Sequence, residues 1–453
     1  MLPVSGPTMN RRHRGLGSAS FSAFLCLVLL TSTALVLEYR SDPGHGSQVG
    51  ARPPANSGLV ASGESVTQAP TPQGRGADAP PFQGVVANVT VGSGPDWATY
   101  DSGNGDVYVA NEYTNNVSVI SGTTVVATVT AGSFPYSAVW DSGNGDVYVA
   151  NEYSNNVSVI SGTTIIGSVN VGASPVDVAY DSGNGDVYVL NYLSNNVSVI
   201  HGTQAVGSVP VENSPASAAY DSGNGDVYVM NSYSANVSVI NETSVIATVP
   251  VGSGPQDAAY DASNGDLYVP NINSGSVSVI DGTSVAGTVP VGLYPSFATY
   301  DSGNGYVYVA NAGPNNVSVI HGTQVAATVP LESSPSSAVY DRGNGYVYVL
   351  EAYSGNVSVI NGTSVIATIP VGSGPQDAAY DAGNGYVYVP NSGSGNVSVI
   401  GAISSPVETV PSSAPGAALW LYALNAGVIG AFVAGVAIYV MRRRRRPAPA
   451  SSF

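Results

Sequence analysis

The stretch Asp101-Ser-Gly-Asn-Gly-Asp-Val-Tyr-Val-Ala-Asn111 decides the fold of this chain. Residues 106–110 are rich in β-branched and aromatic residues, a composition typical of a strand. The Asn104-Gly105 pair before them is a strong signal for a tight hairpin turn, and a short apolar stretch at residues 97–100 precedes it. These features together predict two antiparallel strands joined by a turn.

Two more strands follow this hairpin. Val-Ser-Val-Ile at residues 117–120 alternates with a period of two, Ser121-Gly122 turns the chain, and residues 125–129 form a fourth strand. No segment of the unit shows the 3.6-residue periodicity of a helix. The unit therefore predicts a four-stranded antiparallel sheet.

The unit is written eight times with a period of 40 residues and without an insertion. Its register is marked by Asp101, Asp141, Asp181, Asp221, Asp261, Asp301, Asp341 and Asp381. Repeats of this length indicate solenoids or propellers, and four strands in about 40 residues is typical of a propeller blade. We therefore expect an all-β fold, an eight-bladed β-propeller of four-stranded antiparallel blades, over residues 84–410.

The two ends of the repeat region indicate how the ring closes. The position of the last fourth strand, residues 404–410, is interrupted by Pro406, whereas a spare strand of this type, Val85–Val91, precedes the first unit. Pairing this strand into the last blade would remove an exposed sheet edge. A seven-bladed ring is the alternative, and it would leave one unit unpaired.

The repeat resembles the YVTN-type β-propeller repeat of archaeal surface-layer and other extracellular proteins. The matching stretches begin at Tyr108, Tyr148, Tyr188, Tyr228, Tyr268, Tyr308 and Tyr388, each followed by Val, a variable residue and Asn. The resemblance covers about 320 of the 453 residues, but its third position is never Thr, and Glu351 replaces Asn in one unit. It implies a propeller in an extracellular setting. Propellers host many activities, so function must come from the site.

The composition excludes several classes of protein. Only 9% of residues are charged, all 12 basic residues are Arg, and the hydrophobic share is 43% with 28 Tyr. Such a chain can bury a core, and it is neither disordered throughout nor a basic nucleic-acid binder. Cys26 is the single cysteine, which excludes a disulfide scaffold and a cysteine-based metal site.

The chain ends predict a membrane anchor. Residues 1–18 carry Arg11, Arg12 and Arg14, and the apolar residues 19–37 after them are a signal peptide or an uncleaved signal-anchor helix. Residues 417–441 are predicted to form a transmembrane helix, and residues 442–453 a basic cytosolic tail. Residues 38–83 read as a disordered stalk rich in Pro, Gly and Ser, and residues 411–416 as a short tether.

The charges agree with this topology. The two ends carry +3 and +5, and the region between them carries −25. The positive-inside rule places the ends in the cytosol and the propeller outside the cell membrane. The scarcity of charge suggests an acidic or otherwise harsh exterior, in which stability depends little on ion pairs.

Ten sequons of the type Asn-x-Ser/Thr predict N-glycosylation of the extracellular region. They begin at Asn88, Asn116, Asn156, Asn196, Asn236, Asn241, Asn316, Asn356, Asn361 and Asn396. The alternative is that Asn only turns the chain and that Ser lies on the solvent side of a strand.

The sequence contains no pattern for a metal or cofactor. The Asp101 turn has a superficial likeness to a calcium loop but lacks the alternating ligands and distal Glu, so a structural turn is favoured. His201 and His321 occupy equivalent turns on separate blades and cannot converge on one site. We therefore expect no cofactor, no metal and no histidine-based catalysis.

Residues that vary after each recurrent Pro, near one mouth of the channel, are the candidates for a ligand face: Asp96, Trp97, Tyr136, Asp177, Gln256, Asp257, Phe297, Gln376 and Asp377. The loop between the second and third strands, with Glu112-Tyr113 and Glu152-Tyr153, belongs to the same face. Drift at unconstrained positions, including solvated loop acids, is the alternative interpretation of this variation.

Together these patterns predict a non-enzymatic extracellular propeller, anchored to the membrane and acting in cell-surface recognition or adhesion, or as part of the cell envelope. Its expected partners are the membrane and cell-surface glycans or envelope proteins, with no nucleic acid. The alternative is a sugar- or lactone-directed enzyme that uses Asp177, Asp257 and Asp377 at the channel mouth. A sensor is less favoured, because only 12 residues follow the predicted membrane helix.

Overall fold

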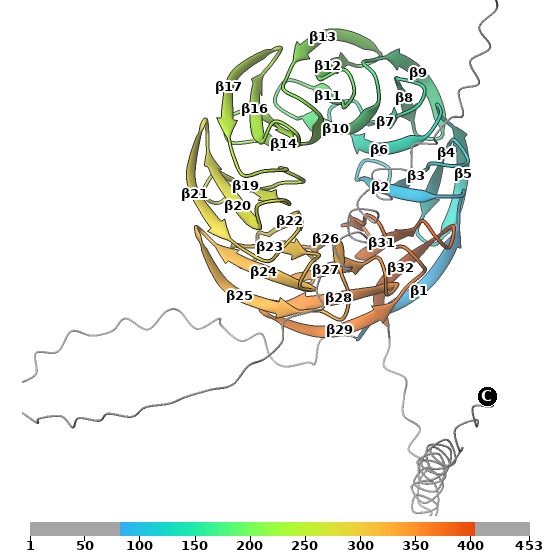
Figure 1. The fold of residues 1–453 in the computed structure, drawn as a ribbon. Coiled ribbons are helices and arrows are strands. Elements are labelled where there is room, and N and C mark those ends of the chain that lie inside the picture. The colour runs from blue at the N-terminus through green and yellow to red at the C-terminus, as the bar shows by residue number, and fades with distance from the viewer. Residues whose placement is uncertain (1–81, 404–453) are drawn as a thin grey trace, which may run out of the picture. The chain divides into compact units, whose positions relative to one another are not determined.

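The computed structural model describes residues 82–403, which form a closed ring of eight four-stranded antiparallel sheets around a central axis (Figure 1). We call the region about this axis, which the first strands surround, the channel. The predicted eight-bladed propeller is confirmed, and the seven-bladed alternative is wrong, because every sheet has its four strands. Among the described residues no helix is long and apolar enough to cross a membrane. The predicted segments 19–37, 411–416, 417–441 and 442–453 lie outside this range, as do residues 404–410.

Each blade runs from a first strand beside the channel to a fourth strand at the rim (Figure 1). The first strands of blades 1–8 are β2 (Pro95–Asp101), β6 (Pro135–Trp140), β10 (Pro175–Asp181), β14 (Pro215–Asp221), β18 (Ala259–Asp261), β22 (Pro295–Asp301), β26 (Pro335–Asp341) and β30 (Ala379–Asp381). The second strands are β3 (Asp106–Asn111), β7 (Asp146–Asn151), β11 (Asp186–Asn191), β15 (Asp226–Asn231), β19 (Asp266–Asn271), β23 (Tyr306–Asn311), β27 (Tyr346–Glu351) and β31 (Tyr386–Asn391).

The outer half of each blade holds the remaining strands. The third strands are β4 (Asn116–Ser121), β8 (Asn156–Ser161), β12 (Asn196–His201), β16 (Asn236–Asn241), β20 (Ser276–Asp281), β24 (Asn316–His321), β28 (Asn356–Asn361) and β32 (Asn396–Ile403). The fourth strands are β5 (Thr124–Thr130), β9 (Thr164–Asn170), β13 (Gln204–Pro210), β17 (Ser244–Pro250), β21 (Ser284–Pro290), β25 (Gln324–Pro330), β29 (Ser364–Pro370) and, in blade 8, β1 (Phe82–Thr90).

The ring closes in the way that the sequence predicts. β1 pairs antiparallel with β32, from Phe82 opposite Ile403 to Thr90 opposite Asn396, so the N-terminal strand completes the last blade. A second link joins blade 8 to blade 1, because the Tyr388 hydroxyl donates to the carbonyl oxygen of Gly122 at 2.7 Å. Closure therefore rests on a full strand pairing and on a side-chain hydrogen bond.

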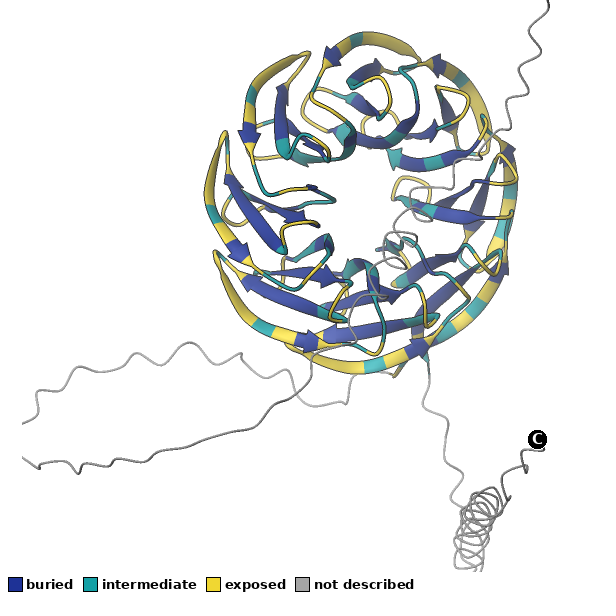
Figure 2. Ribbon diagram, viewed as in Figure 1, coloured by how far each residue is buried: buried dark blue, intermediate teal, exposed yellow. Residues whose placement is uncertain are grey.

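The core lies between neighbouring blades, not within one sheet. Second and third strands are almost wholly buried on both faces, whereas fourth strands alternate exposed and covered residues (Figure 2). Between blades 2 and 3, for example, Tyr148 and Val157 of blade 2 pack with Val178 and Val189 of blade 3. Each blade thus covers an apolar face of the next, which is why the repeats need a closed ring.

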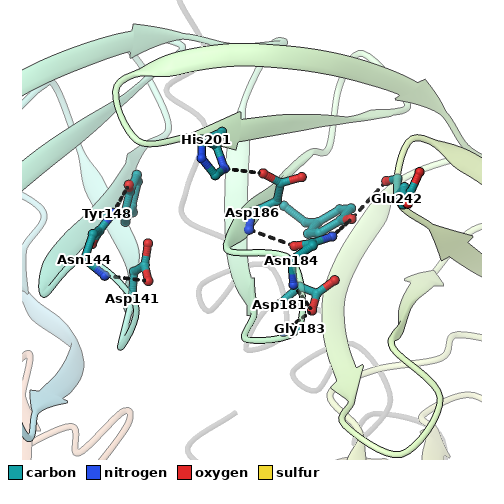
Figure 3. Close-up of polar contacts among 10 residues, drawn as sticks. Asp141, Asn144, Tyr148, Asp181, Gly183, Asn184, Asp186, His201 and Glu242 are labelled. Atoms are coloured by element: carbon teal, nitrogen blue, oxygen red, sulfur yellow. Dashed lines mark hydrogen bonds and ion pairs between the residues drawn. The ribbon is translucent and has the colours of Figure 1, made fainter.

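The turn after the first strand is a hydrogen-bonded unit. In blade 3 the Asp181 carboxylate accepts the Gly183 N–H at 2.8 Å, and Asn184 Oδ1 accepts the Asp186 N–H at 2.8 Å (Figure 3). Gly185 has a φ of 79°, which glycine adopts without strain. The loop between Asp181 and Asp186 is four residues long, so the predicted tight two-residue turn is wrong, although the hairpin is present.

Two first strands, β18 and β30, are only three residues long, whereas the others have six or seven. Their second-strand partners carry Pro270 and Pro390 at the third position of the Tyr-Val-x-Asn motif. Proline has no N–H to donate to the neighbouring strand, so the ladder is interrupted there. Only isolated bridges, Pro255 with Asn271 and Pro375 with Asn391, remain at the start of these strands.

Candidate functional site

Two sets of loops meet at one mouth of the channel: those before the first strands and those between the second and third strands. In blade 1 the Glu112 N–H donates to Gly94 O at 2.9 Å, and the Tyr113 N–H donates to Ser93 O at 3.1 Å. The Glu152 N–H donates to Phe134 O in the same way in blade 2. The expectation that both loop sets share a face agrees with this geometry, and we call them the mouth loops.

A group of acids lies at the mouth of blades 1 and 2, and no cationic partner for it is present within residues 82–403. Asp96 on β2 is 8% exposed and Glu112 is 4% exposed. Burial raises the pKa of Asp96 to about 7. Burial, with repulsion from Asp96 and Glu152, raises the pKa of Glu112 to about 9. Tyr136 lies near the same acids. Burial, together with the negative charges of Asp96 and Glu112, raises the pKa of its hydroxyl well above its ordinary value.

Asp177 on β10 connects three blades. Its Oδ1 accepts the Ser137 hydroxyl of blade 2 at 3.0 Å and its own neighbour's N–H, from Val178, at 2.9 Å. Its Oδ2 accepts the Ala218 N–H of blade 4 at 3.0 Å. Burial raises the pKa of Asp177 to about 7 despite these bonds, and repulsion from Asp257 adds to the shift. The Asp177 carboxylate therefore links blades 2, 3 and 4 through hydrogen bonds.

Asp257 and Asp377 repeat this arrangement. Ser217 donates to Asp257 at 2.9 Å, and Ser337 donates to Asp377 at 3.4 Å, each across 40 residues and one blade boundary. Burial raises the pKa of Asp257 to about 6 and that of Asp377 to about 8. Both acids are half-buried and hydrogen-bonded across a blade boundary, which favours a structural role over solvated loop acids.

The glutamines beside these acids bond locally. The Gln256 N–H donates to Pro270 O at 2.9 Å, and its amide Nε2 donates to Pro255 O at 3.2 Å. The Gln376 amide Nε2 donates to the Ser392 hydroxyl at 3.1 Å. Both side chains support their own mouth loops.

Two aromatic candidates belong to the core between blades. Trp97 donates its Nε1 hydrogen to Ala138 O at 3.0 Å and packs against the cluster shared by blades 1 and 2. Phe297 packs in the same way against the cluster shared by blades 6 and 7. The structure therefore does not join them to the acids at the mouth. Of the predicted ligand-face residues it brings within electrostatic reach of one another Asp96, Tyr136, Asp177, Asp257 and Asp377.

Exposed aromatic rings lie beside these acids. Phe134 stacks on Tyr153, with ring centroids 4.3 Å apart and an interplanar angle of 17°, and the Tyr113 ring lies 6.0 Å from Phe134 at a tilt of 57°. Tyr113 is 61% exposed and Tyr153 is 49% exposed, whereas Phe134 is buried. We call Tyr113, Phe134 and Tyr153 the aromatic platform.

Sequence reasoning missed Phe134. The signal was present, since Gly94, Gly254 and Gly374 occupy the equivalent position in other repeats. Phe134 holds a φ of 59°, an unusual backbone conformation for a non-glycine residue.

The ten sequons fall into two groups. In seven sequons the Asn begins a third strand, and the Ser two residues further on is buried. In blade 1, for example, Asn111 Nδ2 donates to Asn116 Oδ1 at 2.8 Å and to Ser118 Oγ at 3.0 Å. The remaining three, at Asn88, Asn241 and Asn361, have an exposed Asn and an exposed Thr. These three present a sequon that a transferase can reach in the folded ring.

None of the basic side chains within residues 82–403 lies at the mouth. Residues 82–403 contain 24 carboxylates and one arginine, Arg342. His201 is exposed in an outer turn, where it contacts Asp186 at 2.8 Å (Figure 3), and His321 packs edge-on against Tyr306. No group of three or more His, Cys, Asp or Glu within the described residues has a geometry that could hold a metal ion.

Comparisons with known proteins give the fold. No family model matches the chain, and no curated protein matches it. A catalytically inactive virginiamycin B lyase from Staphylococcus aureus, solved with quinupristin, is 13% identical with a TM-score of 0.52, covering 65% of this chain and 98% of its own. A hydrazine synthase structure from Kuenenia stuttgartiensis is 16% identical with a TM-score of 0.50, covering 71% and 98%. At these identities the likeness shows a β-propeller and carries no function.

Proposed function

We propose that this chain is a membrane-anchored, N-glycosylated extracellular β-propeller that acts in cell-surface recognition or adhesion without being an enzyme. The observation that supports it best is the asymmetry of the mouth loops. The framework strands are nearly identical in all eight repeats. Among the described residues, the mouth loops of blades 1 and 2 combine buried acids with an exposed tyrosine, Tyr153, stacked on the buried Phe134. Binding residues are commonly carried by variable loops on a rigid scaffold.

The extracellular location in this proposal rests on the sequence. The Arg-rich ends next to the apolar segments 19–37 and 417–441 favour an exterior propeller by the positive-inside rule. The three exposed sequons are compatible with that location.

A structural role in a cell envelope is the second form of this proposal, and the rim of the ring favours it. No fourth strand contains a charged residue, and Val126, Ile166, Val206 and Ile246 on these strands are between 49% and 55% exposed. Uncharged, apolar edge strands readily pair with other chains. Neighbouring copies in an envelope would cover these edges.

An enzyme that uses the channel acids is the alternative. The near-neutral pKa values of Asp96 and Asp177 favour it, since perturbed carboxyl groups cluster at active sites. The hydrogen bonds that occupy both oxygens of Asp177 support the structural interpretation of that residue instead. Turnover of a sugar or lactone by the purified chain, lost in Asp96→Asn, would support the enzyme.

The recognition proposal is tested by adhesion. Cells carrying Tyr113→Ala with Tyr153→Ala should lose binding to partner cells or to isolated envelope, whereas cells carrying Tyr353→Ala, an equally exposed tyrosine at the same loop position in blade 7, should keep it. Protease treatment of intact cells should release peptides of residues 82–403. Equal adhesion of all three strains, or protection of these peptides, would contradict the proposal.

A further inference from the structure

We propose that the mouth of blades 1 and 2 binds a small organic cation that carries an ammonium or quaternary ammonium group. The site comprises Asp96, Glu112 and the aromatic platform, whose Tyr113 interacts with both acids. This inference rests on the proposed recognition function and names the chemistry of its ligand.

Asp96 is the observation that points to a ligand. Its side chain is more than nine-tenths buried, and it makes no hydrogen bond with any residue of the range 82–403. The equivalent repeats show what a satisfied carboxylate looks like here, since Asp177, one position further along its strand, accepts three hydrogen bonds. A buried carboxylate without a partner is costly, and a bound cation would remove that cost.

The surroundings of Asp96 are uniformly acidic. Glu112, Tyr113, Tyr136, Glu152 and Asp377 are the titratable groups that face it or its neighbours from blades 1, 2 and 8. Arg342, the single arginine of the described ring, lies in a turn after the first strand of blade 7, and that turn belongs to the face opposite the mouth loops. The local field therefore attracts a cation and repels an anion.

The aromatic platform gives the ligand an organic character. Tyr113, Phe134 and Tyr153 are carried by the same loops as Glu112 and Glu152, so rings and carboxyl groups share one small area. Aromatic faces attract ammonium and quaternary ammonium groups, and recognition by several rings is typical of such ligands. A bare metal ion is disfavoured, because no cluster of the described residues has metal-binding geometry.

Binding should be coupled to proton release. Burial raises the pKa of Asp96 to about 7 and that of Glu112 to about 9, so protons occupy these carboxyl groups in acid. A cation at the site favours the ionised carboxylate and lowers both pKa values. The ligand therefore displaces a proton into solvent, and its affinity should fall as the pH decreases through these values.

The test uses the full-length chain and titration calorimetry with choline and with putrescine, with glucose as the uncharged comparison. At pH 8 we expect a cation to bind the wild-type chain, with at least about a tenfold loss of affinity in Asp96→Asn and in Tyr153→Ala. Glu332→Gln removes an exposed acid from a mouth loop of blade 7, and Tyr353→Ala removes an equivalent tyrosine; both should bind as wild type. The heat should vary with the ionisation enthalpy of the buffer, and affinity at pH 5 should be at least about tenfold lower.

Three results would overturn the inference: no binding of either cation, equal binding by Asp96→Asn and Glu332→Gln, or binding of glucose in place of the cations. Glu112→Gln provides a second variant if Asp96→Asn does not fold, as judged by circular dichroism. If neither cation binds but the double tyrosine variant still loses adhesion, the proposed cationic ligand is excluded and the proposed recognition function remains. Adhesion by the double tyrosine variant equal to that of the wild type would remove the recognition function itself.

Discussion

In five of the eight blades, the buried tyrosine of the second strand donates a hydrogen bond to a backbone carbonyl of the next blade. In blade 3, Asn184 Nδ2 donates to the Tyr188 hydroxyl at 3.2 Å, and that hydroxyl donates to Glu242 O of blade 4 at 2.9 Å (Figure 3). The same hydroxyl bond joins Tyr108 to Gly162 and Tyr308 to Gly362. The Tyr-Val-x-Asn motif therefore uses tyrosine, and not phenylalanine, because the ring fills the core while the hydroxyl joins two blades.

Tyr188→Phe should lower the free energy of unfolding by about 0.5–1.5 kcal/mol, because the Asn184 amide and the Glu242 carbonyl each lose a hydrogen bond. Denaturant unfolding of the two proteins measures the difference. Tyr233→Phe, at a tyrosine that is 69% exposed, is the matched control and should leave stability unchanged. Equal stability of Tyr188→Phe and wild type would show that the hydroxyl does not link the blades.

The sequons should differ in occupancy according to their exposure. Glycopeptide mass spectrometry of the native protein should find glycans at Asn88, Asn241 and Asn361, whose Asn and Thr are exposed. Asn116 and its six equivalents should be bare, because the hydroxyl of Ser118 is buried and bonded to Asn111. Glycans on the third-strand sequons would mean that modification precedes folding, and would contradict this prediction.

At the scale of the element, β1 is the strand on which closure depends. Val89 is buried among blade 8 and blade 1 side chains, and eight of the nine residues of β1 pair with β32. Without β1, the outer edge of β32 and its apolar face would be open to solvent.

Deletion of residues 82–90 should lower Tm by more than about 10 °C, since it removes a whole strand pairing and exposes apolar core. A deletion of nine residues from the predicted stalk, such as residues 50–58, is the control and should not change Tm. Differential scanning calorimetry gives both values. An unchanged Tm without β1 would exclude this closure.

Much of the element structure could be predicted from the sequence, because turn and strand signals recur in a fixed register. The same local reasoning missed the short β18 and β30, although Pro270 and Pro390 were visible, because the effect of a proline depends on which neighbour needs its N–H. The site was predicted less well. Asp96 and Asp177 look alike in sequence, but only the packing of three blades shows that Asp177 is bonded on every side.

At the scale of the whole molecule, the ring is stabilised by apolar packing and neutral hydrogen bonds. Among residues 82–403 the only contact between a basic and an acidic side chain is that of His201 Nδ1 with Asp186 Oδ1 at 2.8 Å. Every carboxyl group of the ring with a resolved shift has its pKa raised by burial, among them Asp96, Asp177, Asp257 and Asp377. The native state therefore binds protons more tightly than the unfolded chain does.

The free energy of unfolding of the ring should decrease as the pH rises. An acid whose pKa is raised by folding is protonated in both states below pH 4, so its burial then costs little. As the pH rises towards the native pKa values of about 6 to 9, the unfolded chain ionises freely while the native ring resists ionisation. Stability should be greatest in acid, which agrees with the acidic exterior suggested by the scarcity of charge.

Thermal unfolding of the full-length chain between pH 4 and pH 8 is the most direct test of the central claim, that the mouth and channel bury acids without cationic partners. We predict that Tm at pH 4 exceeds Tm at pH 8 by at least about 5 °C. In Asp177→Asn, which removes one raised pKa and keeps the shape of the side chain, this difference should shrink. A Tm that rises from pH 4 to pH 8 would contradict the claim.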